Sequence, residues 1–533
     1  MHGFFGSYKT PCAWDLSGYQ DESFLRRTHS DDVFSLTQVT LPKFAKDKYF
    51  VESDDCFLAT EGVLFVADTP EEAITRYRNG DTLFWDSWRG SFAGVLYDAK
   101  NDTLYLFNDH TGSKMLFYAK TADGLVFASD LKLLTQTVNA AEYDESFVQA
   151  ILKDGCTDDE RTFVRGIKRL TAGQCLKLCG QDMQILRYHR FDNTPWPYNE
   201  QQMIHEANRL FRQAVERVIR KNEAESLRHF YPLSGGLDSR MCQWVARQLT
   251  PQPITNFTFS QTGHYDHLVP QEISRALGNE WRFLPLDGGD YIVQHIDSVC
   301  ARTEWLVNYM LPAEIDHFAR QQDWTDVGVV LTGINGDNIF ATETDNAHEM
   351  ARIYTQGFNG NSLGSPVVMQ HYTESYSPFC DVDVLDFVLH VPTAKRRNYY
   401  FYDRFVLTCY PEAARWHHKH MQIGHRPPMV TILGRNIFLR DMLKRAGMSV
   451  LKRLHIYDAY RATEKDSMNP YDYWAEQNPA ILRQMEAYHD QYRHLITPYD
   501  WYKACEEKMR FGSVVEKAKV LTIESAIENL RIS

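Results

Sequence analysis

The sequence predicts a protein of three parts: a β-rich N-terminal region, a central α/β region with a parallel sheet, and a helical C-terminal region. Three observations lead to this prediction. Short apolar runs between polar turns fill residues 1–190, strand-like and helix-like segments alternate over 200–430, and residues 431–533 lack glycine-rich loops. A chain of 533 residues has room for several domains of roughly 100–200 residues. We therefore expect domains at 1–190, 200–430 and 431–533.

In the N-terminal region, runs rich in β-branched and aromatic residues predict strands. The segments in question are Thr103–Phe107, Lys114–Tyr118 and Leu125–Ala128. A linker is expected at Phe191–Glu200, because this segment contains two prolines and an Asn-Thr pair. The linker separates the β-rich region from the α/β region.

In the central region, the alternation of strands and helices predicts a parallel sheet with helices on both faces. The expected strands are His229–Ser234, Ile254–Phe259, Trp281–Leu286 and Val327–Gly333, and the expected helices are Leu237–Leu249 and Pro270–Leu277. From about residue 430 onward we expect helices. There the amphipathic stretch Tyr471–Tyr488 is predicted to pack on the central domain or on a partner, since its Tyr and Trp residues suit a core or an interface.

Composition excludes several classes of function. With 57 Lys and Arg against 70 Asp and Glu, the net charge is −13, which speaks against a binder of nucleic acid or anionic membranes. No apolar run approaches the ~18 residues that cross a bilayer, and the first residues, MHGFFG, do not resemble a secretion signal. Ten cysteines without a CxxC pair are typical of reduced thiols. We expect a cytoplasmic protein without membrane insertion.

The sharpest motif is SGGLDS, residues 234–239, placed where a predicted strand ends and a helix begins. Ligands bind at this edge of an open parallel sheet. Gly235 and Gly236 let the backbone approach an anion, and the helix N-terminus offers free N–H groups. Ser234 and Ser239 add hydroxyl donors, while Asp238 suits Mg²⁺ held against phosphate. The spacing differs from the Walker pattern, and the plainer alternative is a Gly-Gly turn capped by serines.

This motif resembles the pyrophosphate loop of asparagine synthetases and other ATP pyrophosphatases, which cleave ATP to AMP and pyrophosphate. TGINGD, residues 332–337, resembles the family's second acidic motif and places Asp337 on its Mg²⁺-binding Asp. Asn338 stands where the family has Glu, and Ile334 where it has an acidic residue or a catalytic Tyr. The resemblance implies that ATP and Mg²⁺ are bound, with the metal at Asp238 and Asp337. It assigns ATP or pyrophosphate contacts to Ser234, Gly235, Gly236, Leu237, Asp238, Ser239, Ser260 and Gly333.

Two further segments extend the resemblance. WHHK, residues 416–419, is similar to the family's WRxK stretch, so Lys419 is the candidate catalytic residue. Its ammonium group would neutralise charge as pyrophosphate leaves. The alternative is a solvated basic turn. ESYSPFCD, residues 374–381, resembles a segment that we interpret as structural.

The N-terminal region resembles the glutaminase domain of the same synthetases. NDHTGSK, FASDLK and GIKRLTAG, which start at Asn108, Phe127 and Gly166, match its motifs. The resemblance implies an αββα sandwich of the N-terminal-nucleophile type. However, His2 stands where the family has its nucleophilic cysteine, which attacks the glutamine amide. Thr60-Glu61-Gly62 replaces the glutamine-holding NGE, and Arg89 replaces an Asp. We therefore expect a degenerate domain and a nitrogen source other than glutamine.

The resulting hypothesis is an ATP-dependent synthetase that adenylates a small-molecule or peptide carboxylate and condenses it with a substrate amine or ammonia. β-Lactam synthetases and lasso-peptide cyclases resemble it in this logic, and natural-product, modified-peptide or surface-glycan biosynthesis is the expected setting. A homodimer or a partner protein of the pathway is left open. A catalytically silent scaffold is the alternative, motivated by Ile334 and Asn338. The acidic charge and the lack of paired cysteines disfavour an RNA- or sulfur-modifying enzyme.

Overall fold

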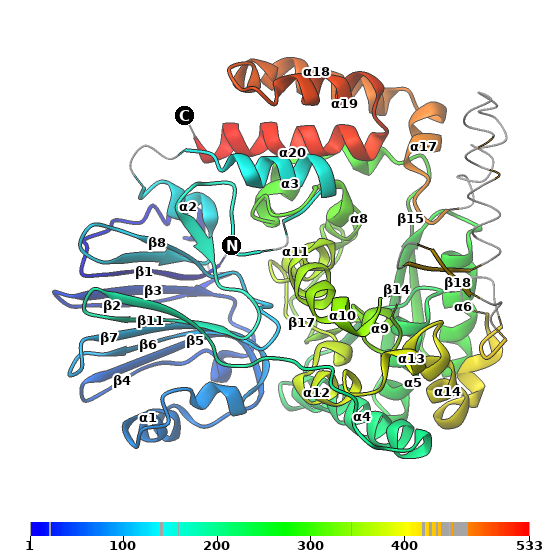
Figure 1. Cartoon of the computed structure of the whole chain (residues 1–533), viewed down its shortest axis with the longest axis horizontal. Helices are drawn as coiled ribbons and strands as arrows, with labels where there is room; N and C mark the ends of the chain where they lie inside the picture. The colour runs from blue at the N-terminus through cyan, green and yellow to red at the C-terminus, as the bar shows by residue number, and fades with distance from the viewer. Residues whose placement is uncertain are drawn as a thin grey trace.

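The computed structural model describes residues 2–20, 23–138, 142–157, 159–342, 344–417, 422–425, 429–432, 435–438, 447, 450 and 467–531. Within these residues the N-terminal region forms two stacked antiparallel sheets of six strands each (Figure 1). The first sheet has the order β10 (Ile167–Arg169), β8 (Phe117–Lys120), β9 (Leu125–Ala128), β1 (Gly3–Tyr8), β3 (Phe34–Thr40) and β2 (Leu25–Ser30). The second has the order β12 (Asp182–Arg187), β11 (Gln174–Cys179), β7 (Thr103–Asn108), β6 (Arg89–Asp98), β5 (Cys56–Val66) and β4 (Phe50–Ser53).

Apolar side chains fill three layers around these two sheets. Phe4, Leu36 and Val95 belong to the buried cluster between the sheets. The outer face of the second sheet packs on α1 (Pro70–Arg78) and on the short helix η3 (Phe84–Ser87). The outer face of the first sheet packs on α2 (Leu131–Thr135) and α3 (Glu145–Asp154). The N-terminal region is therefore an αββα sandwich, which confirms the expected fold class.

The central region is built on parallel strands. β13 (His229–Pro232), β14 (Ile254–Ser260) and β15 (Glu280–Pro285) are parallel neighbours in that order. On the other side of β13, a bridge between Arg228 and Val327 leads to β16 (Val330–Leu331), which pairs in parallel with β17 (Ser375–Tyr376). After β13 the chain forms β14 on one side of that strand, and β16 later takes the other side. The loops that follow β13 and β16 therefore lie side by side. Such a switch point is where open α/β sheets bind ligands.

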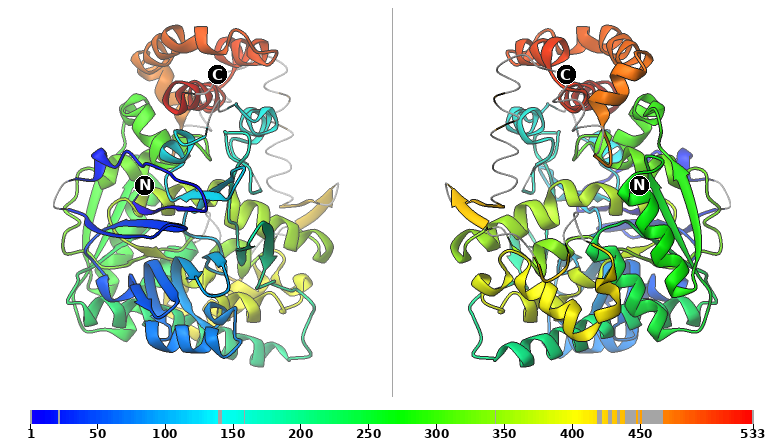
Figure 2. Two further views of the ribbon diagram at one scale, coloured as in Figure 1. Left: turned by 90° about the vertical axis from the view of Figure 1, so that its left-hand side faces the viewer. Right: turned by 90° about the vertical axis from the view of Figure 1, so that its right-hand side faces the viewer.

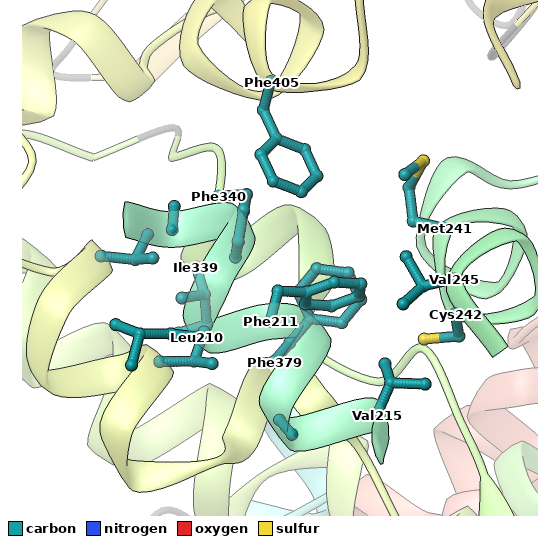
Figure 3. Close-up of a cluster of buried hydrophobic side chains, with 14 of the residues drawn as sticks. Leu210, Phe211, Val215, Met241, Cys242, Val245, Ile339, Phe340, Phe379 and Phe405 are labelled. Carbon is teal, nitrogen blue, oxygen red and sulfur yellow. The ribbon is translucent and has the colours of Figure 1, made fainter. Parts of the chain in front are cut away.

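Helices α4 (Glu200–Ala224), α5 (Leu237–Leu249) and α12 (Val382–Val388) share one apolar core with the loops behind the switch point. In Figure 3, Phe211 of α4 and Phe379 lie between Phe340 on one side and Val245 on the other. Phe211 and Phe379 pack with ring centroids 4.8 Å apart. This core holds α5, which carries the SGGLDS motif at its start, against the segment that follows β16.

The elements agree with the sequence in type and differ in several bounds. The predicted helix at Leu237–Leu249 is α5, and the strand at Leu125–Ala128 is β9. The helix expected at Pro270 starts earlier, since α6 spans Tyr265–Leu277 and the His264 side chain caps it by accepting from the Asp266 N–H. The strand expected over Val327–Gly333 shrinks to the two residues of β16.

The C-terminal region corrects the expectation of helices throughout. β18 (Met429–Ile432) and β19 (Arg435–Phe438) form an antiparallel hairpin. The predicted amphipathic stretch divides near Pro479 into α17 (Tyr471–Gln477) and α18 (Ala480–Ile496), because proline lacks the N–H that would continue α17. Two helices follow, α19 (Tyr502–Phe511) and α20 (Val514–Leu530).

Helices α17–α20 pack on the N-terminal region as well as the central one (Figure 2). Their buried residues share a cluster with Phe147 of α3 and with Trp305, which follows α7 (Ile296–Arg302). The Trp305 indole N–H donates to the Ser525 hydroxyl at 3.1 Å. Along the described part of the chain, no helix combines the length and apolar character that spanning a bilayer requires.

Candidate functional site

The SGGLDS segment forms a tight loop between β13 and α5. The Ser239 hydroxyl accepts from the Ser234 N–H at 3.0 Å and lies 3.0 Å from the Ser234 hydroxyl. The Ser234 hydroxyl in turn accepts from the Gly236 N–H at 3.2 Å. Gly236 is the N-cap of α5 and has no side-chain cap, so the first turn of the helix keeps backbone N–H groups for a ligand.

Position 235 must be glycine because an aromatic ring lies too close to it for any side chain. A Cβ on Gly235 would lie 2.2 Å from the Tyr265 ring. The Tyr265 hydroxyl donates to the Gly235 carbonyl at 3.0 Å, and the Gly235 N–H donates to Asp266 at 2.7 Å. The start of α6 therefore fixes the loop from the side, a contact that the motif alone does not predict.

The loop after β16 packs directly on the first loop through two glycines. A Cβ on Gly333 would lie 2.5 Å from the Ser239 nitrogen, and one on Gly336 would lie 2.4 Å from the Asp238 carboxyl carbon. Asn335 takes a left-handed conformation, with φ 67°, and its amide donates to the Gly357 carbonyl at 2.8 Å. Because both loops are this close, the TGINGD segment is held against the start of α5.

This packing brings the two predicted metal ligands together. The Asp337 N–H donates to Asp238 Oδ2 at 3.1 Å. The Tyr399 hydroxyl donates to Asp337 Oδ2 at 3.4 Å. Tyr402 of α14 (Tyr400–Cys409) is fully buried, and burial together with the nearby Asp238 charge raises its pKa well above the usual range. Two carboxylates at a helix N-terminus suit Mg²⁺ bound with phosphate oxygens.

A cavity of about 330 Å³ opens beside these loops. Its polar wall is made by Ser234, Gly236, Asp238, Ser239, Thr332, Gly333, Asp266 and Glu314. Its apolar wall includes Phe257, Phe259, Ile315, Val330, Ile334, Pro366 and Met369. One end therefore suits anionic phosphate with a metal, and the remainder suits an apolar or aromatic group.

Glu314 of α8 (Met310–Ala319) is a charged residue of this cavity that the sequence motifs do not indicate. Burial raises its pKa to about 7, although the side-chain amide of Asn469 donates to it at 2.6 Å. The sequence motifs do not indicate Glu314, because its contact with Asn469 joins two segments that are far apart along the chain.

Four positions named in the sequence analysis behave differently from the rest. Ser260 is fully buried, bonds to the Gln261 carbonyl at 3.2 Å, and is not among the described residues that line the cavity. Ile334 lines the cavity, and its carbonyl accepts from the Ser377 hydroxyl at 2.7 Å. Asn338 accepts from Arg352 at 3.0 Å and donates to Asn335. Leu237 is buried in the core behind the loop.

Lys419 lies outside the described residues, but the segment leading to it is anchored on the first loop. Arg240 is fully buried and donates to the carbonyls of Trp416 and His417, at 2.8 and 2.9 Å. It also donates to the Gly235 carbonyl at 2.9 Å and to the Ala413 carbonyl at 3.1 Å. Arg240 thus ties the end of the WHHK region, as far as His417, to the SGGLDS loop.

In the N-terminal region, His2 and Glu61 lie together in a buried cluster. His2 Nε2 is 2.7 Å from the Gln370 carbonyl, and Nδ1 is 3.5 Å from Glu61 Oε1. Glu61 also accepts from the Thr40 hydroxyl at 2.9 Å and lies 3.8 Å from Lys48 Nζ. Burial opposes its ionisation, but the Lys48 charge and the His2 hydrogen bond lower its pKa to about 2.

A second buried ion pair closes this cluster from the central region. Lys114 Nζ lies 2.6 Å from Glu374, and both side chains are nearly inaccessible to solvent. Lys43 donates to the carbonyls of Trp324, Val327 and Tyr372 across the same contact. Buried charged side chains of the N-terminal sandwich therefore lie at its contact with the central region.

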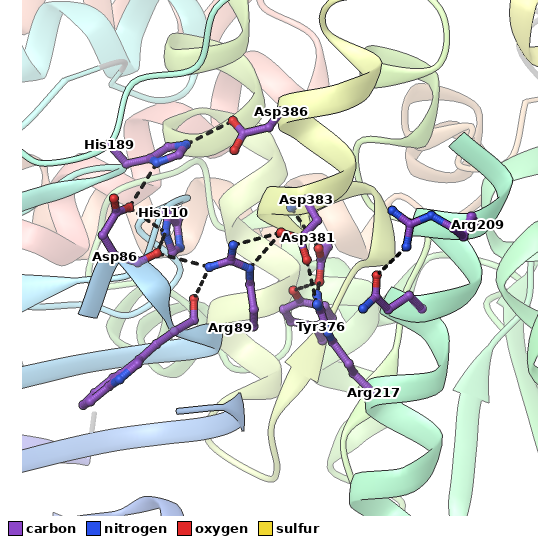
Figure 4. A network of polar contacts seen from close by, with 12 residues as sticks. Asp86, Arg89, His110, His189, Arg209, Arg217, Tyr376, Asp381, Asp383 and Asp386 are labelled. Carbon is purple, nitrogen blue, oxygen red and sulfur yellow. Dashed lines mark hydrogen bonds and ion pairs between the residues drawn. The ribbon is translucent and has the colours of Figure 1, made fainter. Parts of the chain in front are cut away.

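Arg89 links the two regions further out, as Figure 4 shows. Arg89 Nε donates to Asp383 of α12 at 3.0 Å. Asp383 and Asp381 each accept from Arg217 of α4 at 2.6 Å. Arg89 is therefore committed to an ion pair with the central region.

Comparison with known proteins gives matches for both regions. Residues 58–189 match a family described as a glutamine amidotransferase domain, and residues 206–360 match one described as asparagine synthase. The glutamine-hydrolyzing asparagine synthetase 1 of Bacillus subtilis (strain 168) is 25% identical over 293 residues, which are 53% of this chain and 44% of the relative. Asparagine synthetase 3 of the same organism is 26% identical over 163 residues, or 30% and 26% of the two chains. The matches span less than half the length of these relatives.

Among solved structures, the glutamine phosphoribosylpyrophosphate amidotransferase of B. subtilis, complexed with ADP and GMP, aligns at 12% identity with a TM-score of 0.25. That alignment covers 53% of this chain and 65% of the other. A structure titled as the allosteric regulatory enzyme of purine biosynthesis aligns at 10% identity with a TM-score of 0.23, over 49% and 60% of the two chains.

Proposed function

We propose that the chain is an asparagine synthetase-like, ATP-dependent carbon–nitrogen ligase that releases AMP and pyrophosphate. The observation that carries this proposal is the contact of the two loops, which sets Asp238 and Asp337 side by side at the start of α5. The cavity next to them has a polar end for phosphates and an apolar remainder. The asparagine synthase match covers these loops.

In the proposed reaction, a carboxylate oxygen of the substrate attacks the α-phosphorus of ATP, and the bond to pyrophosphate breaks. An amine or ammonia then attacks the acyl carbon, and AMP leaves. The backbone N–H groups of the first turn of α5 bind the phosphates, with Ser234 and Ser239 as further donors. Mg²⁺ at Asp238 and Asp337 would supply charge neutralisation for the phosphates. Lys419 stays the proposed catalytic cation.

We further propose that glutamine is not the nitrogen donor. An amidotransferase of this type needs a cysteine thiolate, and His2 stands in its place. Glu61, Lys48 and Lys114 occupy the adjoining space as buried ions. Arg89 is paired with Asp383 rather than available for a substrate. Displacing these side chains to bind glutamine would leave buried charges unpaired, which is strongly unfavourable.

This chemistry indicates the chemical class of the two substrates. We propose a small-molecule or peptide carboxylate with an apolar part, in keeping with the apolar wall of the cavity, and an amine on the substrate or free ammonia. Biosynthesis of a natural product, a modified peptide or a surface glycan in the cytoplasm remains the proposed setting.

Product analysis tests the proposal. The full chain is incubated with Mg²⁺, ATP, ammonium and a library of carboxylates, and nucleotides are separated. We expect AMP and pyrophosphate with a subset of the carboxylates, and their loss in Asp238→Asn and Asp337→Asn. Asp182→Asn, on exposed β12, is the matched control and should behave as the wild type.

Three results would contradict the proposal or a part of it. Formation of ADP and phosphate would exclude an AMP-forming ligase. Turnover by neither the wild type nor the control, together with no ATP binding by calorimetry, would favour the silent scaffold. Stimulation by glutamine without added ammonium would overturn the part of the proposal that concerns the nitrogen source.

A further inference from the structure

Three potential metal ligands meet where the chain leaves the N-terminal region. Asp86 belongs to η3, His110 follows β7, and His189 follows β12 (Figure 4). His189 Nδ1 lies 3.1 Å from Asp86 Oδ1, and His110 Nε2 lies 3.2 Å from the same oxygen. One ligand atom from each residue can be chosen so that all three lie within 4.8 Å of one another. Side chains from three separate segments therefore converge on one point.

Two of the three spacings between these atoms are compatible with the edges of a coordination polyhedron. Zinc binds imidazole nitrogen and carboxylate oxygen at ~2.0–2.2 Å, so adjacent ligand atoms around it lie ~3.0–3.5 Å apart. The two distances to Asp86 Oδ1 fall in this range. The imidazole rings are nearly perpendicular, at 84°, with centroids 4.8 Å apart, so they approach the point from different directions.

The second nitrogen of His189 has the partner that metal-bound histidines usually have. Its Nε2 lies 3.1 Å from Asp386 of α12. A carboxylate on the far nitrogen fixes the tautomer and the ring orientation of a metal-ligating histidine. His110 is nearly inaccessible and the His189 side chain is mostly buried, whereas the Asp86 side chain is 47% exposed. A metal bound here would keep a coordination position open towards solvent.

The carboxylates around the cluster carry a negative charge that either a divalent cation or protonated histidines would balance. Arg89 lies next to the cluster, with its guanidinium donating to the Asp86 carbonyl at 3.1 Å, but its charge is matched by Asp383. Asp86 and Asp386 then remain as two carboxylates facing two imidazoles. One divalent ion balances them with both imidazoles neutral, which is the form that binds metals.

We propose that Asp86, His110 and His189 bind one divalent transition-metal ion, with Zn²⁺ the best match to two imidazoles and a carboxylate. Asp386 orients His189 from the central region. The ion fastens the residues just before the linker to η3 and, through Asp386, to α12. The site is separate from Asp238 and Asp337, so the proposal does not depend on the proposed ligase activity.

Metal titration of the full chain tests this proposal. Protein freed of metal with a chelator is titrated with Co²⁺, whose visible absorption reports nitrogen and oxygen ligands, and then with Zn²⁺ as competitor. We expect one Co²⁺ to bind per chain, Zn²⁺ to displace it, and Zn²⁺ to raise the Tm. His110→Asn, His189→Asn and Asp86→Asn should each abolish these signals. Asp386→Asn should weaken Zn²⁺ binding by about 10–100-fold.

Controls separate this site from other histidines. His205→Asn, exposed on α4, should bind Zn²⁺ as the wild type does. Circular dichroism in the absence of metal checks that each variant is folded, and the wild-type Co²⁺ spectrum provides a readout that needs no variant. Absence of a Co²⁺ spectrum in the wild type would overturn the proposal. Zn²⁺ binding that survives in His110→Asn and His189→Asn but is lost in His417→Asn would also overturn it, because the metal would then sit near the WHHK segment.

Discussion

Asp238 shows how much one residue depends on its neighbours. Its carboxylate accepts from the Asp337 N–H and stands against two glycines that leave no room for a Cβ. The SGGLDS motif predicts that Asp238 lies at a helix N-terminus, and the structure places it there. The motif cannot predict Tyr402, which borders it from α14, because that contact joins residues about 160 positions apart.

At the same scale, Glu314 gives a pH-dependent prediction. Its pKa in the folded state is about 7, above the value near 4.3 of an unfolded chain. Between these values the folded state binds more protons than the unfolded state, so this residue's contribution to stability falls as the pH rises. We expect Glu314→Gln to raise the free energy of unfolding by about 1–3 kcal/mol near pH 8, and to change it little near pH 5.

Urea denaturation at both pH values measures this effect. Glu507→Gln, at an exposed position of α19, is the control and should show no difference between the two conditions. A Glu314→Gln variant that is destabilised equally at both pH values would contradict the prediction, since it would mean that Glu314 is ionised throughout.

At the scale of elements, Arg240 connects α5 with the segment that leads to Lys419. A lysine at this position cannot donate all of these hydrogen bonds to the carbonyls of Gly235, Ala413, Trp416 and His417. We expect Arg240→Lys to lower the free energy of unfolding by about 2–3 kcal/mol and to slow AMP formation. Chemical denaturation and initial rates measure the two effects.

Arg404→Lys is the matched control for Arg240→Lys. Arg404 lies on the surface of α14 and pairs with Glu200, with about half of its side chain exposed. This substitution should leave both quantities nearly unchanged. If Arg240→Lys kept the stability and the rate of the wild type, the hydrogen bonds of Arg240 would contribute to neither property.

Elements also show where sequence patterns predict the fold and where they do not. Helix α5 and strand β9 have the predicted bounds. The sequence analysis expects helices from about residue 430 onward and therefore does not predict the hairpin β18–β19. The Glu61–Lys48 and Lys114–Glu374 pairs join segments that only the tertiary fold brings together, so no local pattern could predict them.

At the scale of the whole molecule, Lys114 and Glu374 couple the N-terminal sandwich to the central region. Both are buried, so removing one charge leaves the other unpaired in a poorly solvated place. We expect Lys114→Met and Glu374→Met each to destabilise the protein by about 3–5 kcal/mol. The double variant should recover most of this loss, because two apolar side chains need no partner.

Thermal and chemical unfolding of the four proteins form a double-mutant cycle. The matched control is the surface pair Lys168 and Glu160, whose side chains are about half exposed. Its coupling energy should not exceed about 1 kcal/mol. Additive effects of Lys114→Met and Glu374→Met would show that the two regions are not coupled through this pair.

The cluster shared by Phe147, Trp305 and the residues of α20 has a consequence for biogenesis. During translation, the apolar face of α3 leaves the ribosome more than 350 residues before α20, which covers it. Most of the chain must therefore be made while the part of that face that α20 covers is open to solvent and to other nascent chains, a condition that promotes aggregation. Chaperones that bind apolar surfaces can act on this face of α3 only until α20 packs against it.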